Sequence, residues 1–256
     1  MKILLLILVL LLGCENKNDI FYYYDGESPA LPIVRKISDS TVDILDNKNA
    51  GTGTILKKTK QYTYILTCAH IIANRKRKHT PIFDFKALGG YNISPNTSFF
   101  ESIIKPILVK QTKWVNGMPY IHSSSADIFF LDRTNDICLL RVRGKIYGAE
   151  ITPYSRGPVV PIGTEVYHVG NLLGSLNYSV TSGIISHNSR GLFGERIQAG
   201  ITVTLGSSGG GIFVKNTGEY VGMVSAKTKY NDGIAIIIPI KKILKWLEVY
   251  NVERNF

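Results

Sequence analysis

A serine in a glycine-rich stretch near the end of the chain could act as a nucleophile. Residues 204–213 read TLGSSGGGIF, which places Ser208 among glycines that allow a tight backbone turn. Acyl transfer needs a hydroxyl nucleophile and backbone N–H donors directed at the position where an oxyanion forms. The stretch therefore predicts Ser208 as nucleophile and the N–H groups of Gly206 and Ser208 as an oxyanion hole. Turns rich in Gly and Ser are also common without any catalytic role, so the prediction depends on finding a base.

A histidine and an aspartate farther upstream could supply that base and its orienting partner. His70 ends the β-rich run YTYILTCAH, and Asp136 begins the β-rich run DICLLRV. The chain order His70, Asp136, Ser208 is one of the orders in which Ser-His-Asp triads occur. In such a triad the histidine accepts the serine proton, and the aspartate holds the histidine in the productive tautomer.

Two other aspartates compete with Asp136 for the third position. Asp136 is preferred because it directly precedes an apolar strand in TNDICLLRV. Asp127 also precedes an apolar run, IFFL, and is the second choice, and Asp132 is the remaining competitor.

The elements that must position these residues are predicted to be short strands. Runs such as IVRKI, TVDIL, GTGTIL and TYIL, with a turn signal at residues 46–49, are typical of a barrel or sandwich. Apolar residues at helical spacing after Pro239 predict an amphipathic helix over residues 239–250. Further strands are predicted at residues 165–169, 178–186, 196–203, 211–215, 220–226 and 233–238.

Several of these segments resemble those of trypsin-like serine proteases of the chymotrypsin fold, most closely the bacterial Deg/HtrA branch. The resemblance runs from about residue 50 to the C-terminus, and the stretch between His70 and Asp136 matches poorly. The matching segments are GTGTIL (51–56), ILTCAH (65–70), DICLLRV (136–142), VGNLLG (169–174), SVTSGIIS (179–186), IQAGITVTLGSSGG (197–210), VGMVSA (221–226) and DGIAIIIPI (232–240).

This resemblance implies an all-β fold of two six-stranded antiparallel β-barrels with a C-terminal helix. Residues 33–150 would form the first barrel with His70 and Asp136. Residues 151–256 would form the second barrel with Ser208 and the terminal helix, and the crossing between barrels would lie in residues 144–161. The family chemistry uses no metal or cofactor, and none is expected here.

The chain departs from the family pattern at two points. Digestive-type members carry an aspartate directly before the nucleophile that pairs with a freed N-terminus, whereas this chain has Ser207. That activation switch is therefore not expected. The chain also ends soon after the second barrel, so the C-terminal PDZ domain common in the Deg/HtrA branch is not expected either.

By the same resemblance, the primary substrate pocket is lined by residues just before the nucleophile and on a later strand and loop. Trypsin-type pockets carry an aspartate six residues before the nucleophile, where this chain has Thr202. A buried Lys or Arg side chain would lack a counter-ion there, so a small or medium uncharged residue is expected before the cleaved bond. An acidic residue is the alternative if Lys227 reaches the pocket. The expected lining is Thr202, Val203, Ser225, Ala226, Lys227 and Gly233.

The first residues predict export. Lys2 precedes a short apolar run, which is typical of a secretion signal rather than a membrane-spanning helix. The junction LLGC resembles a bacterial lipobox, so residues 1–13 are expected to be a lipoprotein signal peptide and Cys14 the lipidated first residue of the mature chain. An ordinary signal peptide with an incidental cysteine is the alternative. Residues 14–32 would be a tether, and the protein would be anchored to a bacterial membrane on its periplasmic or cell-surface side.

The charge of the chain suggests a surface effect rather than nucleic-acid binding. A formal net charge of +11 could attract anionic lipid, nucleic acid or acidic protein. No DNA- or RNA-binding motif accompanies the charge, so the expected partners are protein or peptide substrates and, through lipidated Cys14, the membrane.

Cys68 and Cys138 lie two residues from His70 and Asp136, one before and one after, on strands that are neighbours in the implied fold. A disulfide is possible in an oxidising compartment. Buried free thiols are the favoured alternative, because bridge geometry cannot be read from a sequence.

The function favoured by these residues is a serine endopeptidase that works through an acyl-enzyme. One alternative is a surface-anchored binding protein on an inactive protease scaffold, because a fold does not guarantee activity. Another is an esterase with the same nucleophile, although α/β-hydrolases order their triad differently.

Overall fold

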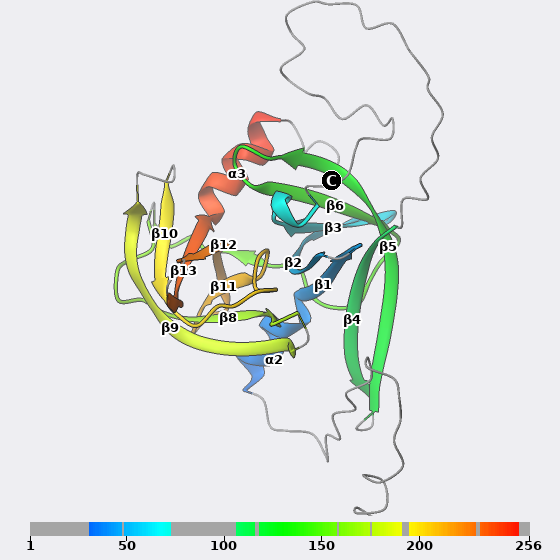
Figure 1. Ribbon diagram of the computed structural model, residues 1–256, viewed down its shortest axis with the longest axis horizontal. Coiled ribbons are helices and arrows are strands. Elements are labelled where there is room, and N and C mark those ends of the chain that lie inside the picture. Colours follow the sequence, from blue (N-terminus) through cyan, green and yellow to red (C-terminus); the bar gives the residue numbers. More distant parts are fainter. Residues whose placement is uncertain are drawn as a thin grey trace, which may run out of the picture.

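The computed structural model describes residues 31–47, 49–72, 106–115, 118–157, 159–174, 176–190, 195–228 and 231–250. Within them the chain forms two β-barrels that lie side by side, the first coloured blue to green and the second yellow to orange (Figure 1). The predicted signal peptide, Cys14 and the tether up to residue 30 lie outside the described residues.

The first barrel closes in the order β1-β2-β3-β6-β5-β4, with every neighbouring pair antiparallel. Both faces of β1 are buried: Val42 and Ile44 are among the fully buried core residues, and Thr41 and Asp43 are buried as well. Successive side chains of a strand point to opposite faces, so the outer face of β1 must be covered by another part of the molecule. The strands are β1 (Thr41–Asp46), β2 (Asn49–Lys58), β3 (Tyr62–Thr67), β4 (Ile107–Val115), β5 (Met118–Asp132) and β6 (Ile137–Arg143).

The second barrel provides that cover, because β8 and β9 contact β1 and β8 also contacts β2. Its sheet runs β11-β8-β9-β10-β13-β12, and a further pairing of β11 with β12 closes it into a barrel. The two-residue strand β7 adds to β12 in parallel. The strands are β7 (Thr152–Pro153), β8 (Glu165–Leu172), β9 (Leu176–Arg190), β10 (Arg196–Gly200), β11 (Gly211–Val214), β12 (Glu219–Thr228) and β13 (Asn231–Pro239).

The C-terminal helix is confirmed as α3 (Ile240–Val249), with Pro239 as its N-cap. Its indole ring at Trp246 packs edge-on against Phe130 of β5, with 5.0 Å between ring centroids. The same indole N–H donates a hydrogen bond to Asp132 at 2.9 Å. The last helix of the chain therefore fastens onto the first barrel close to the segment that carries Asp136.

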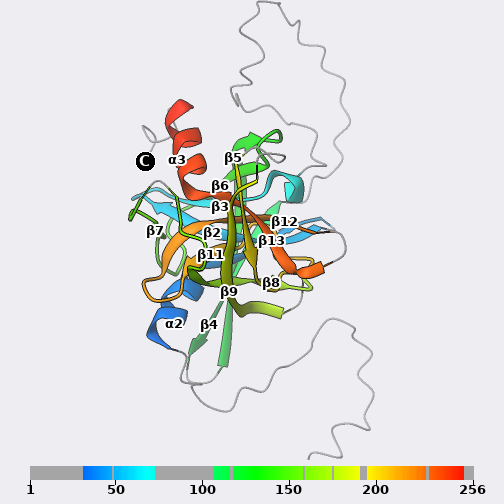
Figure 2. The same cartoon turned by 90° about the vertical axis from the view of Figure 1, so that its left-hand side faces the viewer.

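One predicted strand is wrong. The run IVRKI lies in a helix, α2 (Pro32–Asp39), which begins at Pro32 and ends at Asp39 before β1. Proline is favoured in the first turn because its φ already suits a helix. Ile33 and Ile37, four residues apart, lie on one helix face and both approach Gly218 of the second barrel. The helices α2 and α3 lie on opposite sides of the barrels in both views (Figure 1, Figure 2).

Among the described residues, neither helix is long and apolar enough to cross a lipid bilayer.

Candidate active site

His70 and Asp136 are brought together between the ends of two neighbouring strands. A short 3₁₀ helix, η1 (Ala69–Ile72), follows β3 and carries His70, and Asp136 directly precedes β6. The Nδ1 atom of His70 lies 3.0 Å from both carboxylate oxygens of Asp136, and the His70 backbone N–H donates to Oδ1 at 3.0 Å. The aspartate thus holds both the ring and the backbone of the histidine. Of the three candidate aspartates, Asp136 is the one that contacts His70 in this way.

Asp136 also accepts a hydrogen bond from a second side chain, on the other barrel. The hydroxyl of Ser225, on β12, donates to Oδ2 at 2.6 Å. Burial disfavours the charged carboxylate, but the hydrogen bonds from His70 and Ser225 and the attraction of His70 outweigh it and lower the pKa of Asp136. Asp136 is therefore an anion at neutral pH, which suits a group that orients and stabilises an imidazolium.

The segment before Asp136 is held from the second barrel and from the C-terminal helix. The guanidinium of Arg196, at the start of β10, is buried and donates to the backbone carbonyl of Asn135 at 3.0 Å. Asn135 also donates its backbone N–H to Asp132 at 3.0 Å, and Asp132 accepts the indole N–H of Trp246. Arg196 was not among the predicted site residues, because it is separated from Asp136 by 60 residues and no local pattern links the two.

The backbone conformation around Ser208 requires glycine at two positions. Gly206 and Gly209 have φ values of 89° and 84°, in the left-handed region that favours glycine. A side chain at either position would also collide with backbone: a Cβ on Gly206 would lie 2.1 Å from the Asn171 carbonyl oxygen, and one on Gly209 would lie 1.9 Å from that of Thr52. The turn is therefore pressed against both β2 and the end of β8.

Among the residues that the structure describes, the two expected oxyanion donors have no acceptor. Ser207 donates its N–H to the Thr204 carbonyl at 3.1 Å, and Gly210 donates to the Ser207 carbonyl at 2.9 Å. The N–H groups of Gly206 and Ser208 donate to no acceptor within the described part of the chain. These two N–H groups flank Ser207, and one of them belongs to the candidate nucleophile itself. An oxyanion hole needs two such backbone donors close to the nucleophile.

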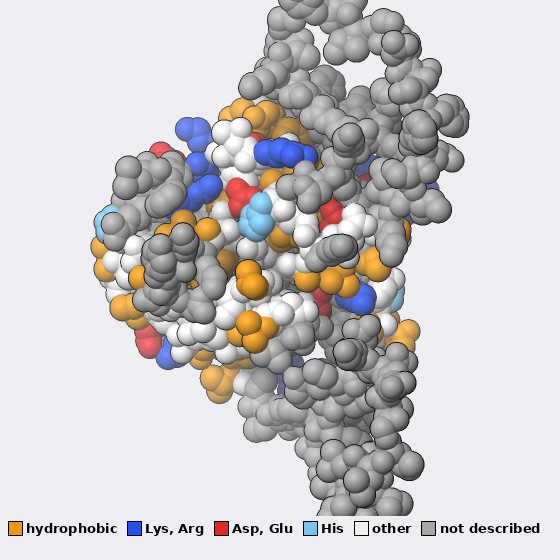
Figure 3. Space-filling view, in the orientation of Figure 1, with side chains coloured by type: hydrophobic (Ala, Val, Ile, Leu, Met, Phe, Trp, Pro, Cys, Tyr) orange, Lys and Arg blue, Asp and Glu red, His pale blue; other side chains and the backbone are white. Residues whose placement is uncertain are grey.

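The Ser208 hydroxyl and His70 do not form a hydrogen bond in the structure, and among the described residues the hydroxyl has no other partner. The His70 side chain is 49% exposed. Hydrogen bonds between catalytic groups are often long without substrate and tighten only in the substrate complex. The face shown in Figure 3 has a histidine beside an acidic side chain at its centre, with hydrophobic side chains below them.

The residues expected to line the substrate pocket lie in different environments. Thr202 is exposed and its carbonyl accepts a hydrogen bond from Thr181, whereas Val203 is only 1% exposed and packs in the core. Ala226 is exposed, and Gly233 accepts the N–H of Ile201 at 2.9 Å.

Ser225 and Lys227 complete the expected lining. The Ser225 hydroxyl donates a hydrogen bond to Asp136, and the side chain of Lys227 lies outside the described residues. The expected preference for an uncharged residue before the cleaved bond stays a prediction.

Cys68 and Cys138 are buried free thiols, the favoured of the two expectations. The Cys68 thiol donates to the Val224 carbonyl at 3.2 Å, and burial together with the negative charge of Asp136 raises its pKa. Cys68, His70 and Asp136 have potential metal-ligand atoms within 4.8 Å of one another. A thiol ligand must lose its proton to bind a metal, and this environment opposes that loss, while His70 and Asp136 already bind each other.

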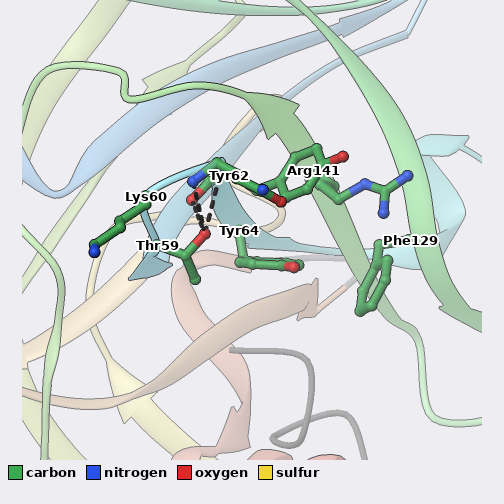
Figure 4. A pocket seen from close by; sticks show the side chains of 7 residues that line it. Thr59, Lys60, Tyr62, Tyr64, Phe129 and Arg141 are labelled. Carbon is green, nitrogen blue, oxygen red and sulfur yellow. Dashed lines mark hydrogen bonds between the residues drawn. The ribbon is translucent and has the colours of Figure 1, made fainter.

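A separate cavity of about 360 Å³ lies on the first barrel. Figure 4 shows Arg141 beside the aromatic rings there; its guanidinium carbon is 4.6 Å from the Tyr62 ring centroid and 5.2 Å from that of Phe129. None of the candidate catalytic residues belongs to this cavity. Its lining residues are Thr59, Lys60, Gln61, Tyr62, Tyr64, Phe129 and Arg141.

Comparisons with known proteins point to the same family as the site geometry. Residues 51–223 match the model of the trypsin-like peptidase domain. Two proteins described as "Serine protease HtrA-like", from Staphylococcus haemolyticus and Staphylococcus epidermidis, are each 24% identical, over 80% and 96% of this chain. The chain spans only 29% and 42% of the length of these curated relatives.

A solved structure supports the fold alone. The serine endoprotease from Yersinia pestis is similar with a TM-score of 0.59 at 22% sequence identity, over 84% of this chain and 64% of that one.

Proposed function

Because the chain belongs to the trypsin-like peptidase family, we propose that it is a serine endopeptidase that hydrolyses peptide bonds through an acyl-enzyme. The observation that carries the proposal is the shared site: the His70–Asp136 pair, and the turn with two unused N–H donors around Ser208. Family membership alone would leave the activity open, because a fold can persist without its chemistry.

In the proposed mechanism, the Ser208 hydroxyl attacks the carbonyl carbon of the peptide bond while His70 accepts the hydroxyl proton. His70 then gives this proton to the leaving amine, and water repeats the sequence on the acyl-enzyme. Asp136 keeps the proton on Nδ1 of His70, so that the other ring nitrogen can act as base, and its charge stabilises the imidazolium. The depressed pKa of Asp136 supports this role.

The N–H groups of Gly206 and Ser208 are proposed to bind the oxyanion that forms at each attack. Hydrogen bonds from these N–H groups become stronger as negative charge develops on the carbonyl oxygen of the substrate. They therefore stabilise the transition state more than the bound substrate. The left-handed conformation of Gly206 supports the assignment, because this turn leaves the Gly206 N–H without an acceptor among the described residues.

A second candidate function is binding by an inactive protease-like protein. The observation that favours it is the missing hydrogen bond between Ser208 and His70 in the structure. We give it second place because His70, the proposed base, contacts its orienting carboxylate, and the two backbone donors have no acceptor among the described residues.

Labelling with a fluorophosphonate probe tests the proposal. The full chain is expected to react covalently at Ser208, and Ser208→Ala and His70→Ala are expected to lose this reaction. Ser125→Ala is the matched control, because it removes the hydroxyl of an exposed serine on β5 of the first barrel and should leave the label on Ser208, as mass spectrometry of the labelled peptide would show. Equal labelling of wild type and Ser208→Ala, or none in the folded wild type, would overturn the proposal.

We also propose that the protein is exported and lipid-anchored through Cys14 to a bacterial membrane, on the periplasmic or cell-surface side. The support is the LLGC junction after the apolar leader. Multiple acyl chains hold a protein to a bilayer firmly, whereas one chain binds reversibly. Cys14→Ser is expected to move the protein out of the membrane fraction or leave the leader uncleaved. A wild-type protein that fractionates as soluble and carries no lipid would contradict the anchor.

A further inference from the structure

Thr52 of β2 connects the first barrel to the turn around Ser208. It is fully buried, and its backbone N–H donates to the Ser208 carbonyl at 2.8 Å. Its hydroxyl donates to the Gly206 carbonyl at 2.8 Å and accepts the N–H of Asn171 at 2.9 Å. Its own carbonyl accepts the hydroxyl of Thr67 at 2.7 Å. Every backbone and side-chain polar group of Thr52 is therefore engaged at the contact between the barrels.

These bonds act on the two residues whose N–H groups would bind the oxyanion. The carbonyls of Gly206 and Ser208 both point at Thr52, which restricts rotation about the backbone of each residue. The N–H groups of the same two residues remain unused by the described part of the chain. Because glycine has wide conformational freedom, Gly206 needs such an external contact to keep a single orientation.

The hydroxyl of Thr52 also connects the turn around Ser208 to the backbone around Asn171. Asn171, which donates to it, is the next-to-last residue of β8 and lies close to Gly206, and Leu173 donates its N–H to the Thr204 side chain at 3.0 Å. A Cβ on Gly206 would meet both the Asn171 carbonyl and the Gly174 nitrogen. The hydroxyl thus sits between two backbone segments, one of which would contain the oxyanion hole.

We propose that Thr52 is a positioning residue for the oxyanion hole: its hydroxyl, shared between Asn171 and Gly206, acts together with its backbone N–H on the Ser208 carbonyl to keep the N–H groups of Gly206 and Ser208 directed at the reacting carbonyl. This inference rests on the proposed protease function. A hydroxyl can donate and accept at once, and no apolar side chain of the same shape can do so.

The inference predicts different results from two substitutions at Thr52. Thr52→Val keeps the shape but leaves a buried carbonyl and a buried N–H without partners, so the turn is expected to sample other orientations. Thr52→Ser keeps the hydroxyl and is expected to stay close to wild type. A misplaced oxyanion donor should lower kcat roughly 10- to 100-fold with little change in KM, given the larger loss when a donor is removed altogether.

Thr63→Val is a matched control. Thr63 is also fully buried in the first barrel, and its hydroxyl likewise donates to a carbonyl, that of Gly144, at 2.9 Å and accepts an N–H, that of Ile146, at 3.3 Å. This control lies away from the Ser208 turn, so it should lower the melting temperature as much as Thr52→Val without changing kcat. An equal loss of kcat in Thr52→Val and Thr63→Val would mean that Thr52 only supports the fold, and would overturn the proposal.

Hydrogen exchange of the turn separates this inference from the proposed function. In the full chain with Ser208→Ala, which removes the proposed nucleophile, Thr52→Val is expected to speed amide exchange in peptides covering residues 204–210, and Thr52→Ser and Thr63→Val are not. If wild type proves unreactive but Thr52→Val still speeds this exchange, the protease assignment fails and the positioning role stands. Unchanged exchange together with unchanged kcat in Thr52→Val would overturn the positioning role.

Discussion

Three kinds of residue make up the candidate site, and they differ in how visible they are in the sequence. Ser208, His70 and Asp136 stand at the ends of recognisable runs, and the structure brings the histidine and aspartate together. Thr52 and Arg196 act through contacts between residues far apart in the chain, and a single sequence holds no signal for such pairs. Ser225 was expected in the substrate pocket, which stays a prediction, and no pattern in the sequence indicated that its hydroxyl contacts Asp136.

The contact between Ser225 and Asp136 leads to a prediction for Ser225→Ala. A hydrogen bond to a charged group contributes about 1.5–3 kcal/mol, so loss of this bond should slow fluorophosphonate labelling by roughly 10- to 150-fold. Ser225→Thr keeps a hydroxyl and should recover part of the rate.

The same substitution should shift stability at acid pH. The folded-state pKa of Asp136 is depressed below 3.8, so its contribution to stability is present above that pH and is lost as pH falls through the folded-state pKa. Without the Ser225 bond that pKa rises, and acid unfolding of Ser225→Ala is expected at higher pH than in wild type. An unchanged labelling rate and an unchanged acid midpoint would contradict the role given to Ser225.

At the scale of the elements, the strand pattern was largely predictable and the ends of strands less so. The turn expected at residues 46–49 does join β1 to β2, and Asn47 there has a positive φ of 54°. β10 ends at Gly200, earlier than the strand predicted over 196–203, because the chain turns there toward Ser208.

The helix α2 escaped prediction for a physical reason. The run IVRKI is rich in β-branched residues, which favour strands. However, Arg35 breaks the alternation that a half-buried strand requires, whereas Ile33 and Ile37 suit one face of a helix after Pro32. The surface that receives this face, around Gly218 of the second barrel, lies more than 180 residues away in the chain, so tertiary packing decided the outcome.

At the scale of the whole molecule, the site depends on how the two barrels meet. The first barrel carries His70, Asp136 and Thr52, and the second carries Ser208 and Ser225. The contact between the two barrels buries Asp43 of β1, which lies directly opposite Thr52 in the sheet. Neither carboxylate oxygen of Asp43 has a hydrogen-bond partner among the described residues.

Burial raises the pKa of Asp43 from 3.8 to about 7, although the positive charge of Lys110 on β4 and the amide of Asn171 near the end of β8, which lies close to the carboxylate but outside hydrogen-bond geometry, both act to lower it. Tyr178 of β9 is the other titratable group near this carboxyl. A raised folded-state pKa means that the folded protein binds a proton more tightly than the unfolded chain. The contribution of Asp43 to stability is therefore fully present below about pH 4 and is lost as pH rises to about 7.

Asp43→Asn tests this reading, because asparagine has nearly the same shape and no charge. The variant is expected to gain stability relative to wild type as pH rises from about 4.5 to 8, by at most about 4 kcal/mol for a shift of roughly three pKa units. Urea unfolding at both pH values measures the difference. Asp127→Asn, at an exposed aspartate of the same barrel, is the control and should change little between them. A stability difference between Asp43→Asn and wild type that is the same at both pH values would mean that Asp43 stays ionised at the barrel contact, and that neighbouring charges rather than protonation make its burial tolerable.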